Sequence, residues 1–242
     1  MNQFTHDKLV QMRLPGMAQE YKRQMDDFGI EELTFDQRIQ LLVDAEYDSR
    51  HNNAIKRLMA TAKLSESSAS IEDIHYYSDR HLNRKQINEL STGHYIRKQQ
   101  NIILIGATGS GKSYIACALG NRACRDKYSV KYIRLPDLLV ELQIARLQGT
   151  YKRLIHQYKK CNLLIVDEWM LVPTTETEQR DLLEIIESRY RIGSAIFCSQ
   201  ISPEGWHSKL GGGPLADAIM DRIVPKSHVI MIEGNTSMRQ RV

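Results

Sequence analysis

The feature that most constrains this chain is a glycine-rich loop followed by lysine and serine. Residues 106–113 read Gly-Ala-Thr-Gly-Ser-Gly-Lys-Ser and fit the pattern G-x-x-x-x-G-K-[ST]. The loop follows the apolar run 102–105, a predicted strand, and opens a predicted helix at 112–126. Glycines let such a loop turn its backbone N–H groups toward phosphate oxygens, and the helix N-terminus favours negative charge. The loop therefore predicts a site for the phosphates of a nucleotide.

Each residue type in this loop has a chemical reason. Lys112 would place its charge on the β- and γ-phosphates, and the Ser113 hydroxyl would ligate Mg²⁺. We assign nucleotide contacts to the whole loop and the first turn of the helix, that is, to Gly106, Ala107, Thr108, Gly109, Ser110, Gly111, Lys112, Ser113 and Tyr114.

The second half of the site is expected at the end of another buried strand. The apolar run 163–166 leads into Asp167 and Glu168. Asp167 would hold Mg²⁺, and Glu168 would orient and polarise the attacking water, which favours hydrolysis of a nucleoside triphosphate. A third apolar run ends in Ser199 and Gln200. Either side chain could face the γ-phosphate, because ligands bind beyond the carboxyl ends of parallel strands.

Strands and helices alternate from residue 101 onward. Predicted strands lie at 102–105, 130–134, 163–166, 195–198 and 229–232, with predicted helices near 112–126, 136–160 and 176–191. This alternation predicts an α/β fold in which helices flank a parallel sheet. The earlier residues show the apolar spacing of helices. We therefore expect a small all-α N-terminal domain at 1–65, a linker region at 66–100 and a nucleotide-binding domain at 101–242.

The N-terminal part allows finer predictions. Pro15 should separate two helices, and Thr34 with Gln37 should form a capping box at the start of a longer one. The residues of that longer helix expected to face inward are Phe35, Ile39, Leu42, Val43 and Tyr47.

Composition excludes several classes of protein. Of the 242 residues, 42% are hydrophobic and 26% are charged, which is typical of a globular protein and not of a disordered or collagen-like chain. No apolar run approaches the roughly 20 residues of a membrane-spanning helix, so we expect no membrane association through such a segment. The four cysteines form no C-x-x-C pair. Reduced thiols and a cytoplasmic location are therefore expected.

The net charge of +4 does not by itself indicate nucleic-acid binding, but two stretches lack acidic residues altogether. Local basic patches can bind a phosphate backbone even when the whole protein is near neutral. A solvated helix face is the alternative for either stretch. The candidate DNA contacts are Arg146, Lys152, Arg153, Lys159 and Lys160 within 142–166, and Arg50, Lys56, Arg57 and Lys63 within 49–65.

Two further arginines have open roles. Arg222 could be a surface arginine paired with Asp221, or an arginine finger donated to the nucleotide of a neighbouring subunit. Arg239, near the end of the chain, is another cation that could reach a phosphate.

Taken together, these residues resemble AAA+ ATPases of the DnaA/DnaC clade, and the likeness is closest to the IstB-type transposition helper ATPases. Beyond the glycine-rich loop, the resemblance rests on Ser-Gln-Ile-Ser-Pro at 199–203, Trp-His at 206–207 and Ala-Asp-Ala-Ile-Met-Asp-Arg at 216–222. About ten residues follow Ile232, so we expect none of the C-terminal helical lid that most AAA+ proteins carry. After Gly234, the ending 235–239 has five residues where the family's Gly-x-Ser-x-Arg has four.

The resemblance also implies roles. ATP and Mg²⁺ become the expected cofactors, with Lys112, Ser113, Asp167 and Glu168 acting as described above. Gln200 or Ser199 becomes the first sensor. Arg222 becomes the finger that acts on a neighbouring subunit, and Arg239 becomes a second sensor.

The expected function is an ATP-switched assembly on duplex DNA, with weak sequence preference, that assists an insertion-sequence transposase. Self-assembly is expected because the finger serves another subunit. A replicative helicase loader of the DnaC type is the alternative, and a preference for single-stranded DNA would favour it. A third hypothesis is a binding module whose nucleotide site is only structural, against which the carboxylate of Glu168 argues.

Overall fold

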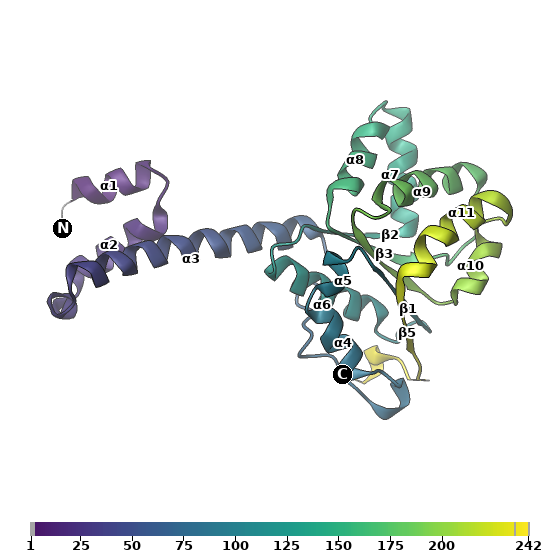
Figure 1. Ribbon diagram of the computed structural model, residues 1–242, viewed down its shortest axis with the longest axis horizontal. Helices are drawn as coiled ribbons and strands as arrows, with labels where there is room; N and C mark the ends of the chain where they lie inside the picture. The colour runs from purple at the N-terminus through teal and green to yellow at the C-terminus, as the bar shows by residue number, and fades with distance from the viewer. Residues whose placement is uncertain (1–2, 235, 242) are drawn as a thin grey trace. The chain divides into compact units, whose positions relative to one another are not determined.

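A computed structural model describes residues 3–234 and 236–241 of the chain (Figure 1). The fold divides into two compact units, Met1–Arg57 and Leu58–Val242. The division comes earlier than the boundary expected at residue 65, because Leu58 and Met59 pack with the core of the second unit. Residues 66–100, expected as a linker, also bury side chains in that core, namely Ala69, Ile74, Ile87, Leu90, Tyr95 and Ile96.

The first unit is helical, as its apolar spacing predicts. It contains α1 (Gln3–Gln11), α2 (Pro15–Asp26), η1 (Phe28–Glu32) and the first part of α3 (Phe35–Ala62). Pro15 occupies the first turn of α2, where its missing N–H is not needed. Thr34 and Gln37 form the predicted capping box. The Thr34 N–H donates to Gln37 Oε1 at 2.9 Å, and the Gln37 N–H donates to Thr34 Oγ1 at 3.3 Å.

The prediction that five residues of α3 face inward is wrong for four of them. Phe35, Ile39, Val43 and Tyr47 are exposed, Phe35 by 79%. Among the side chains of residues 3–57 whose burial the structure describes, the buried hydrophobic ones are Ala18 and Ile30. Helical spacing shows that one face of a helix is apolar, but it does not show whether another element covers that face.

A buried carboxylate joins α2 to α3 within this unit. Glu46 accepts hydrogen bonds from the Gly16 N–H at 2.9 Å, the Met17 N–H at 3.3 Å and Arg50 Nε at 2.6 Å. Gly16 permits this approach, because a Cβ at that position would lie 2.5 Å from Ala45 O. Burial raises the pKa of Glu46, but the hydrogen bonds outweigh that effect and lower it overall. Glu46 thus caps the positive end of α2.

The second unit is built on a five-stranded sheet. The strands lie in the order β2-β3-β4-β1-β5, and every neighbouring pair is parallel. All five predicted strands are present, as β1 (Asn101–Gly106), β2 (Val130–Arg134), β3 (Leu163–Trp169), β4 (Ser194–Ser199) and β5 (Ser227–Ile232). Because β3, β4 and β1 are adjacent and parallel, their carboxyl ends meet at one edge of the sheet.

Helices cover both faces of the sheet (Figure 1). One face carries α4 (Arg84–Ser91), α5 (His94–Arg97) and α6 (Lys112–Arg125), and the other carries α7 (Leu135–Leu147), α8 (Tyr151–Lys160), α9 (Glu176–Arg189), α10 (Pro203–Lys209) and α11 (Gly213–Ile223). The predicted helix at 136–160 is in fact two helices, because the chain turns at Gly149, where φ is +67°. Within residues 3–234 and 236–241, no helix has both the length and the apolar character to cross a membrane.

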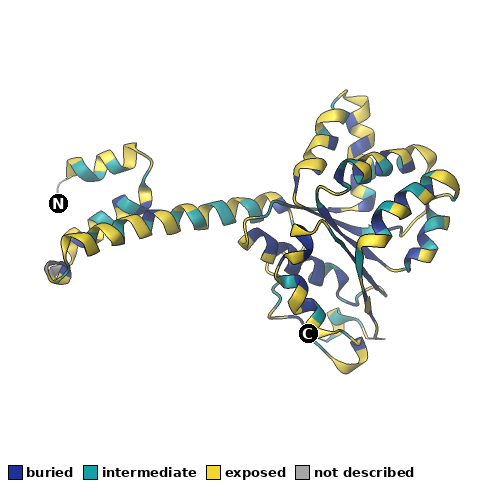
Figure 2. Cartoon of the chain, viewed as in Figure 1, coloured by how far each residue is buried: buried dark blue, intermediate teal, exposed yellow. Residues whose placement is uncertain are grey.

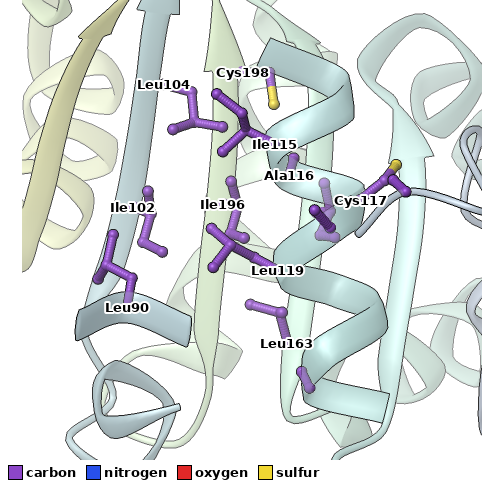
Figure 3. Close-up of a cluster of buried hydrophobic side chains, with 14 of the residues drawn as sticks. Leu90, Ile102, Leu104, Ile115, Ala116, Cys117, Leu119, Leu163, Ile196 and Cys198 are labelled. Atoms are coloured by element: carbon purple, nitrogen blue, oxygen red, sulfur yellow. The ribbon is translucent and has the colours of Figure 1, made fainter. Parts of the chain in front are cut away.

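Alternate side chains of the central strand enter two separate cores. Ile102 and Leu104 pack against α6 (Figure 3), while Ile103 and Ile105 pack against the helices of the other face. The three central strands β1, β3 and β4 are therefore buried on both sides (Figure 2), as their continuous apolar runs predict, whereas Val229 and Met231 of the edge strand β5 are exposed. Two packed cores hold the strand ends, and the polar residues that follow them, in fixed register.

We predict that Glu46→Gln loosens the start of α2 in the full-length chain. Loss of the charge weakens a helix cap, which costs about 1 kcal/mol. The amides of Gly16 and Met17 should therefore exchange with deuterium about fivefold faster in hydrogen-exchange mass spectrometry. Asp44→Asn, which removes an exposed carboxylate from the same helix, is the matched control and should exchange like wild type. Equal exchange in all three proteins would contradict the capping role.

Candidate nucleotide site

The glycine-rich loop lies between β1 and α6, where the sequence predicts it. Gly109 and Gly111 have φ values of +78° and +92°, in the left-handed region that favours glycine. The Lys112 ammonium donates to Gly106 O at 2.8 Å and to Ala107 O at 2.9 Å. Burial lowers the pKa of Lys112. The loop thus holds a partly desolvated cation against its own backbone at the N-terminus of α6.

The predicted magnesium ligands lie in direct contact. Ser113 Oγ donates to Asp167 Oδ2 at 2.5 Å. The Tyr132 hydroxyl donates to the same oxygen at 2.8 Å, and Asp167 Oδ1 accepts the Glu168 N–H at 2.8 Å. Mg²⁺ prefers hard oxygen donors, and it usually takes only one or two from protein and the rest from water and phosphate. The hydroxyl of Ser113 and the carboxylate of Asp167 therefore fit Mg²⁺.

Glu168 lies at an irregular point of β3. The register with β4 shifts between Val166 and Trp169, and Glu168 itself has a φ of +55°. Its carboxylate accepts a hydrogen bond from Arg134 Nη2 at 2.8 Å. Both side chains are partly exposed, so the ion pair stabilises this arrangement by about 1 kcal/mol or less. Arg134 was not predicted from the sequence, although the β2–β3 register places it opposite Asp167.

The structure separates the two sensor candidates. A cavity of about 110 Å³ brings together eight predicted residues: Thr108, Gly109, Lys112, Ser113, Asp167, Glu168, Gln200 and Arg239. Ser199 is 1% exposed. Its hydroxyl donates to Trp169 O at 2.9 Å and accepts from Trp206 Nε1 at 3.0 Å. Ser199 therefore fixes the end of β4, and Gln200 is the one of the two that lines the cavity.

The C-terminal segment lies against the glycine-rich loop. The Met238 N–H donates to Gly109 O at 2.8 Å, and a Cβ on Gly109 would overlap Ser237 Oγ. Arg239 lines the cavity described above and a larger one of about 380 Å³, to which Ile74, His75, Lys112 and Tyr114 also contribute. Arg239 is thus placed beside the loop of its own chain. Asn235, the first residue of the longer ending 235–239, lies outside the described residues.

Arg222 lies elsewhere, on α11. It donates to Glu187 of α9, and its Nη1 donates to Ala218 O at 2.9 Å. The cavity that it lines also involves Arg189 and Tyr190. Among the described residues that line the two cavities around Lys112, Arg222 does not occur. The alternative expectation, that Arg222 pairs with its neighbour Asp221, is replaced by this pairing with Glu187.

Arg80 is a residue of the site that sequence reasoning missed. Its side chain is buried, and it donates to Ser110 O of the loop at 2.7 Å and to His75 O. Burial lowers the pKa of Arg80. The neighbouring Asp79 forms an ion pair with Arg241, which ties this segment to the C-terminal one. No local sequence signal marks Arg80, because the contact is made across thirty positions of the chain.

The two groups of candidate DNA contacts differ in their surroundings. The basic residues Lys152, Arg153, Lys159 and Lys160 are exposed on α8, whose Ile155 and Tyr158 are buried. Arg146 instead pairs with the buried carboxylate of Asp181 and lies over the Tyr151 ring at 4.2 Å. In the other stretch, Arg50 is bonded to Glu46, while Lys56, Arg57 and Lys63 are exposed. Arg146 and Arg50 are thus engaged in ion pairs within the chain, whereas the four basic side chains of α8 face solvent.

We predict that Arg80→Met weakens nucleotide binding. The substitution leaves the buried carbonyl group of Ser110, and the carbonyl group of His75, without their donor, a cost of about 1–3 kcal/mol, so the Kd of a fluorescent ATP analogue should rise about tenfold. Lys85→Met, an exposed substitution nearby, should leave the Kd unchanged. If the melting temperature falls while the Kd stays at the wild-type value, Arg80 supports the fold alone and the prediction is wrong.

The chain is similar to known proteins along nearly its whole length. It is 38% identical over 237 residues to an insertion-sequence ATP-binding protein of Sinorhizobium fredii, covering 98% of this chain and 96% of the relative. In fold it is similar to AMPPCP-bound DnaA from Aquifex aeolicus, with a TM-score of 0.60 and 21% identity over 71% of this chain and 52% of DnaA.

A second similar structure is the DnaC helicase loader, with a TM-score of 0.59 and 15% identity over 68% of this chain and 97% of the loader. These likenesses agree with the expected AAA+ core. The family model described as IstB-like ATP binding protein matches residues 7–242. With its glycine-rich loop and strand-end carboxylates in the places expected from the sequence, the chain belongs to the family of IstB-like ATP-binding proteins.

Proposed function

We propose that this protein is a Mg²⁺-dependent ATPase that assembles on duplex DNA and assists an insertion-sequence transposase. The observation that carries the proposal is the cavity in which Lys112, the Ser113–Asp167 pair and Glu168 meet. The relative from Sinorhizobium fredii is described as an insertion-sequence ATP-binding protein, which supports the link to transposition. Such a role belongs in the cytoplasm.

Hydrolysis follows from the chemistry of these side chains. Lys112 and the loop would bind the phosphates, and Ser113 and Asp167 would hold Mg²⁺, which supplies charge neutralisation when bound. Glu168 would orient the attacking water from the strand end next to Asp167. Its weak ion pair with Arg134 has to open before the carboxylate can do so, and a cost of about 1 kcal/mol or less makes that opening easy.

Assembly is proposed because Arg222, the candidate finger, is not among the described residues that line the cavities around Lys112 of its own chain. Arg222 lines a cavity on the α9 and α11 side of the unit, away from the residues around Lys112. We therefore propose that Arg222 leaves Glu187 and acts on the ATP of an adjoining subunit, with Gln200 and Arg239 sensing the phosphates of their own chain. ATP would then stabilise the contact between two subunits.

The exposed face of α8 is the proposed DNA surface. Its four basic residues lie within a stretch, 142–166, that contains no acidic residue, so no side chain of α8 itself repels a phosphate backbone; the carboxylate of Glu141 on α7 accepts a hydrogen bond from the Tyr158 hydroxyl of α8. No base-reading motif occurs in the sequence, and weak sequence preference is expected. Several subunits side by side would add contacts that offset the cost of bending the duplex.

The second candidate function is that of a helicase loader, favoured by the fold likeness to DnaC. At 15% identity that likeness speaks for the fold alone. The insertion-sequence relative matches at 38% over nearly the whole chain, and this favours transposition.

The proposal predicts tight binding to random-sequence duplex with ATP, and weak binding with ADP or without nucleotide. Lys112→Ala should lose the ATP effect, because the phosphates lose their cation. Glu168→Gln should bind ATP and stay on duplex, since hydrolysis slows by about a hundredfold or more. Fluorescence anisotropy measures the binding of wild type and of each variant to labelled duplex and to labelled single strand of equal length. Duplex binding by Lys112→Ala equal to wild type would refute the ATP switch, and a single-strand preference would favour the loader.

The same assay locates the surface. A variant with glutamine at Lys152, Arg153, Lys159 and Lys160 should bind duplex DNA weakly. Its binding should also depend less on salt: the slope of the logarithm of the binding constant against the logarithm of salt concentration should be smaller by about 0.9 for each phosphate that is no longer neutralised. The matched control carries glutamine at four exposed basic residues outside both acid-free stretches, Lys85, Arg97, Lys98 and Arg180. Equal losses in the two variants would show a general charge effect and remove α8 from the proposal.

A further inference from the structure

Asp167 has a side-chain partner that the nucleotide chemistry does not itself require. Tyr132 lies on the edge strand β2, and its hydroxyl donates to Asp167 Oδ2 at 2.8 Å. We propose that Tyr132 is a positioning residue that fixes the Asp167 carboxylate in the orientation needed to bind Mg²⁺, an inference that rests on the proposed Mg²⁺-dependent function.

The hydrogen bonds around Asp167 divide by their origin. Oδ1 accepts the N–H of Glu168, the next residue in the chain. Oδ2 accepts Ser113 Oγ and the Tyr132 hydroxyl. Ser113 is itself a proposed metal ligand, so its oxygen serves the ion. Tyr132 is therefore the side-chain donor, within the described part of the chain, that can orient the carboxylate without being a ligand.

The position of Tyr132 is well determined. The β2–β3 register pairs Tyr132 with Ile165 and Ile133 with Val166, so the phenol reaches along the sheet to the strand end where Asp167 lies. The ring packs against the hydrophobic core on the α6 face. A phenol held by this packing and by its hydrogen bond to Asp167 has little freedom to turn away.

Partners of this kind have a characteristic effect on metal sites. Groups that orient a ligand without touching the ion typically contribute 10- to 100-fold to metal affinity. They do so by holding the ligand in place before the metal arrives, which reduces the ordering that binding requires. Removal of the Tyr132 hydroxyl should therefore lower the affinity for the metal and leave the affinity for metal-free nucleotide unchanged.

The test uses Tyr132→Phe in the full-length protein, which keeps the ring and removes the hydroxyl. Mn²⁺ replaces Mg²⁺ as an EPR-visible probe, and free Mn²⁺ is measured during titration of the complex with a non-hydrolysable ATP analogue. We expect the Kd for Mn²⁺ to rise about tenfold. The Kd of the nucleotide in the presence of EDTA should not change. Tyr128→Phe, which removes a hydroxyl from a tyrosine against the same core, should behave as wild type in both measurements.

The outcomes are distinguishable. If wild type binds Mn²⁺ with nucleotide and Tyr132→Phe binds it equally tightly, the positioning role is overturned while the proposed ATPase stands. If Tyr132→Phe weakens the binding of Mn²⁺ and of metal-free nucleotide alike, and also lowers the melting temperature, the hydroxyl supports the fold and the proposal is again overturned. If wild type itself takes up no Mn²⁺ beyond that bound by the nucleotide in solution, the metal site of the proposed function fails together with the role of Tyr132.

Discussion

The contact between Ser113 and Asp167 is the interaction on which the rest of the site depends. It joins the first turn of α6 to the end of β3 across 54 positions of the chain. The contact exists because β3, β4 and β1 are adjacent parallel strands whose ends meet at one edge. Two apolar cores, one on each face of the sheet, hold those strands in register. The glycine-rich loop, Gln200 and Tyr132 reach the same place only because this edge is fixed.

Two segments from opposite ends of the second unit hold the loop from outside. Arg80 donates to Ser110 O, and the Met238 N–H donates to Gly109 O. The ion pair between Asp79 and Arg241 joins these two segments to each other. A change in the loop therefore affects both segments, and Arg239 of the C-terminal segment lines the same cavity as Arg80. This arrangement gives the short C-terminal segment a direct physical connection to the nucleotide site.

The sequence predicted the sheet and the core of the site because their signals are local. Short apolar strands, a glycine-rich loop and carboxylates at a strand end are each contained in a few residues, and all of them are present in the structure. Arg80, Arg134 and Tyr132 were missed, because each acts through a contact about thirty positions or more away. The inward face assigned to α3 was wrong because apolar spacing shows a stripe and not what covers it. Arg146 and Ser199 show the reverse case, in which a residue of the right type is engaged in holding the structure.

The central claim is that ATP is hydrolysed at a site completed by a second subunit, and mixing two inactive variants tests it most directly. Lys112→Ala lacks the phosphate cation but keeps Arg222, and Arg222→Ala lacks the finger but keeps the loop. Phosphate release should be low for each variant alone. In the mixture, the loop of one variant can meet the arginine of the other, and ATP turnover well above the sum of the two is expected on duplex DNA. A mixture no more active than that sum, formed from variants that still assemble together, would contradict the shared site.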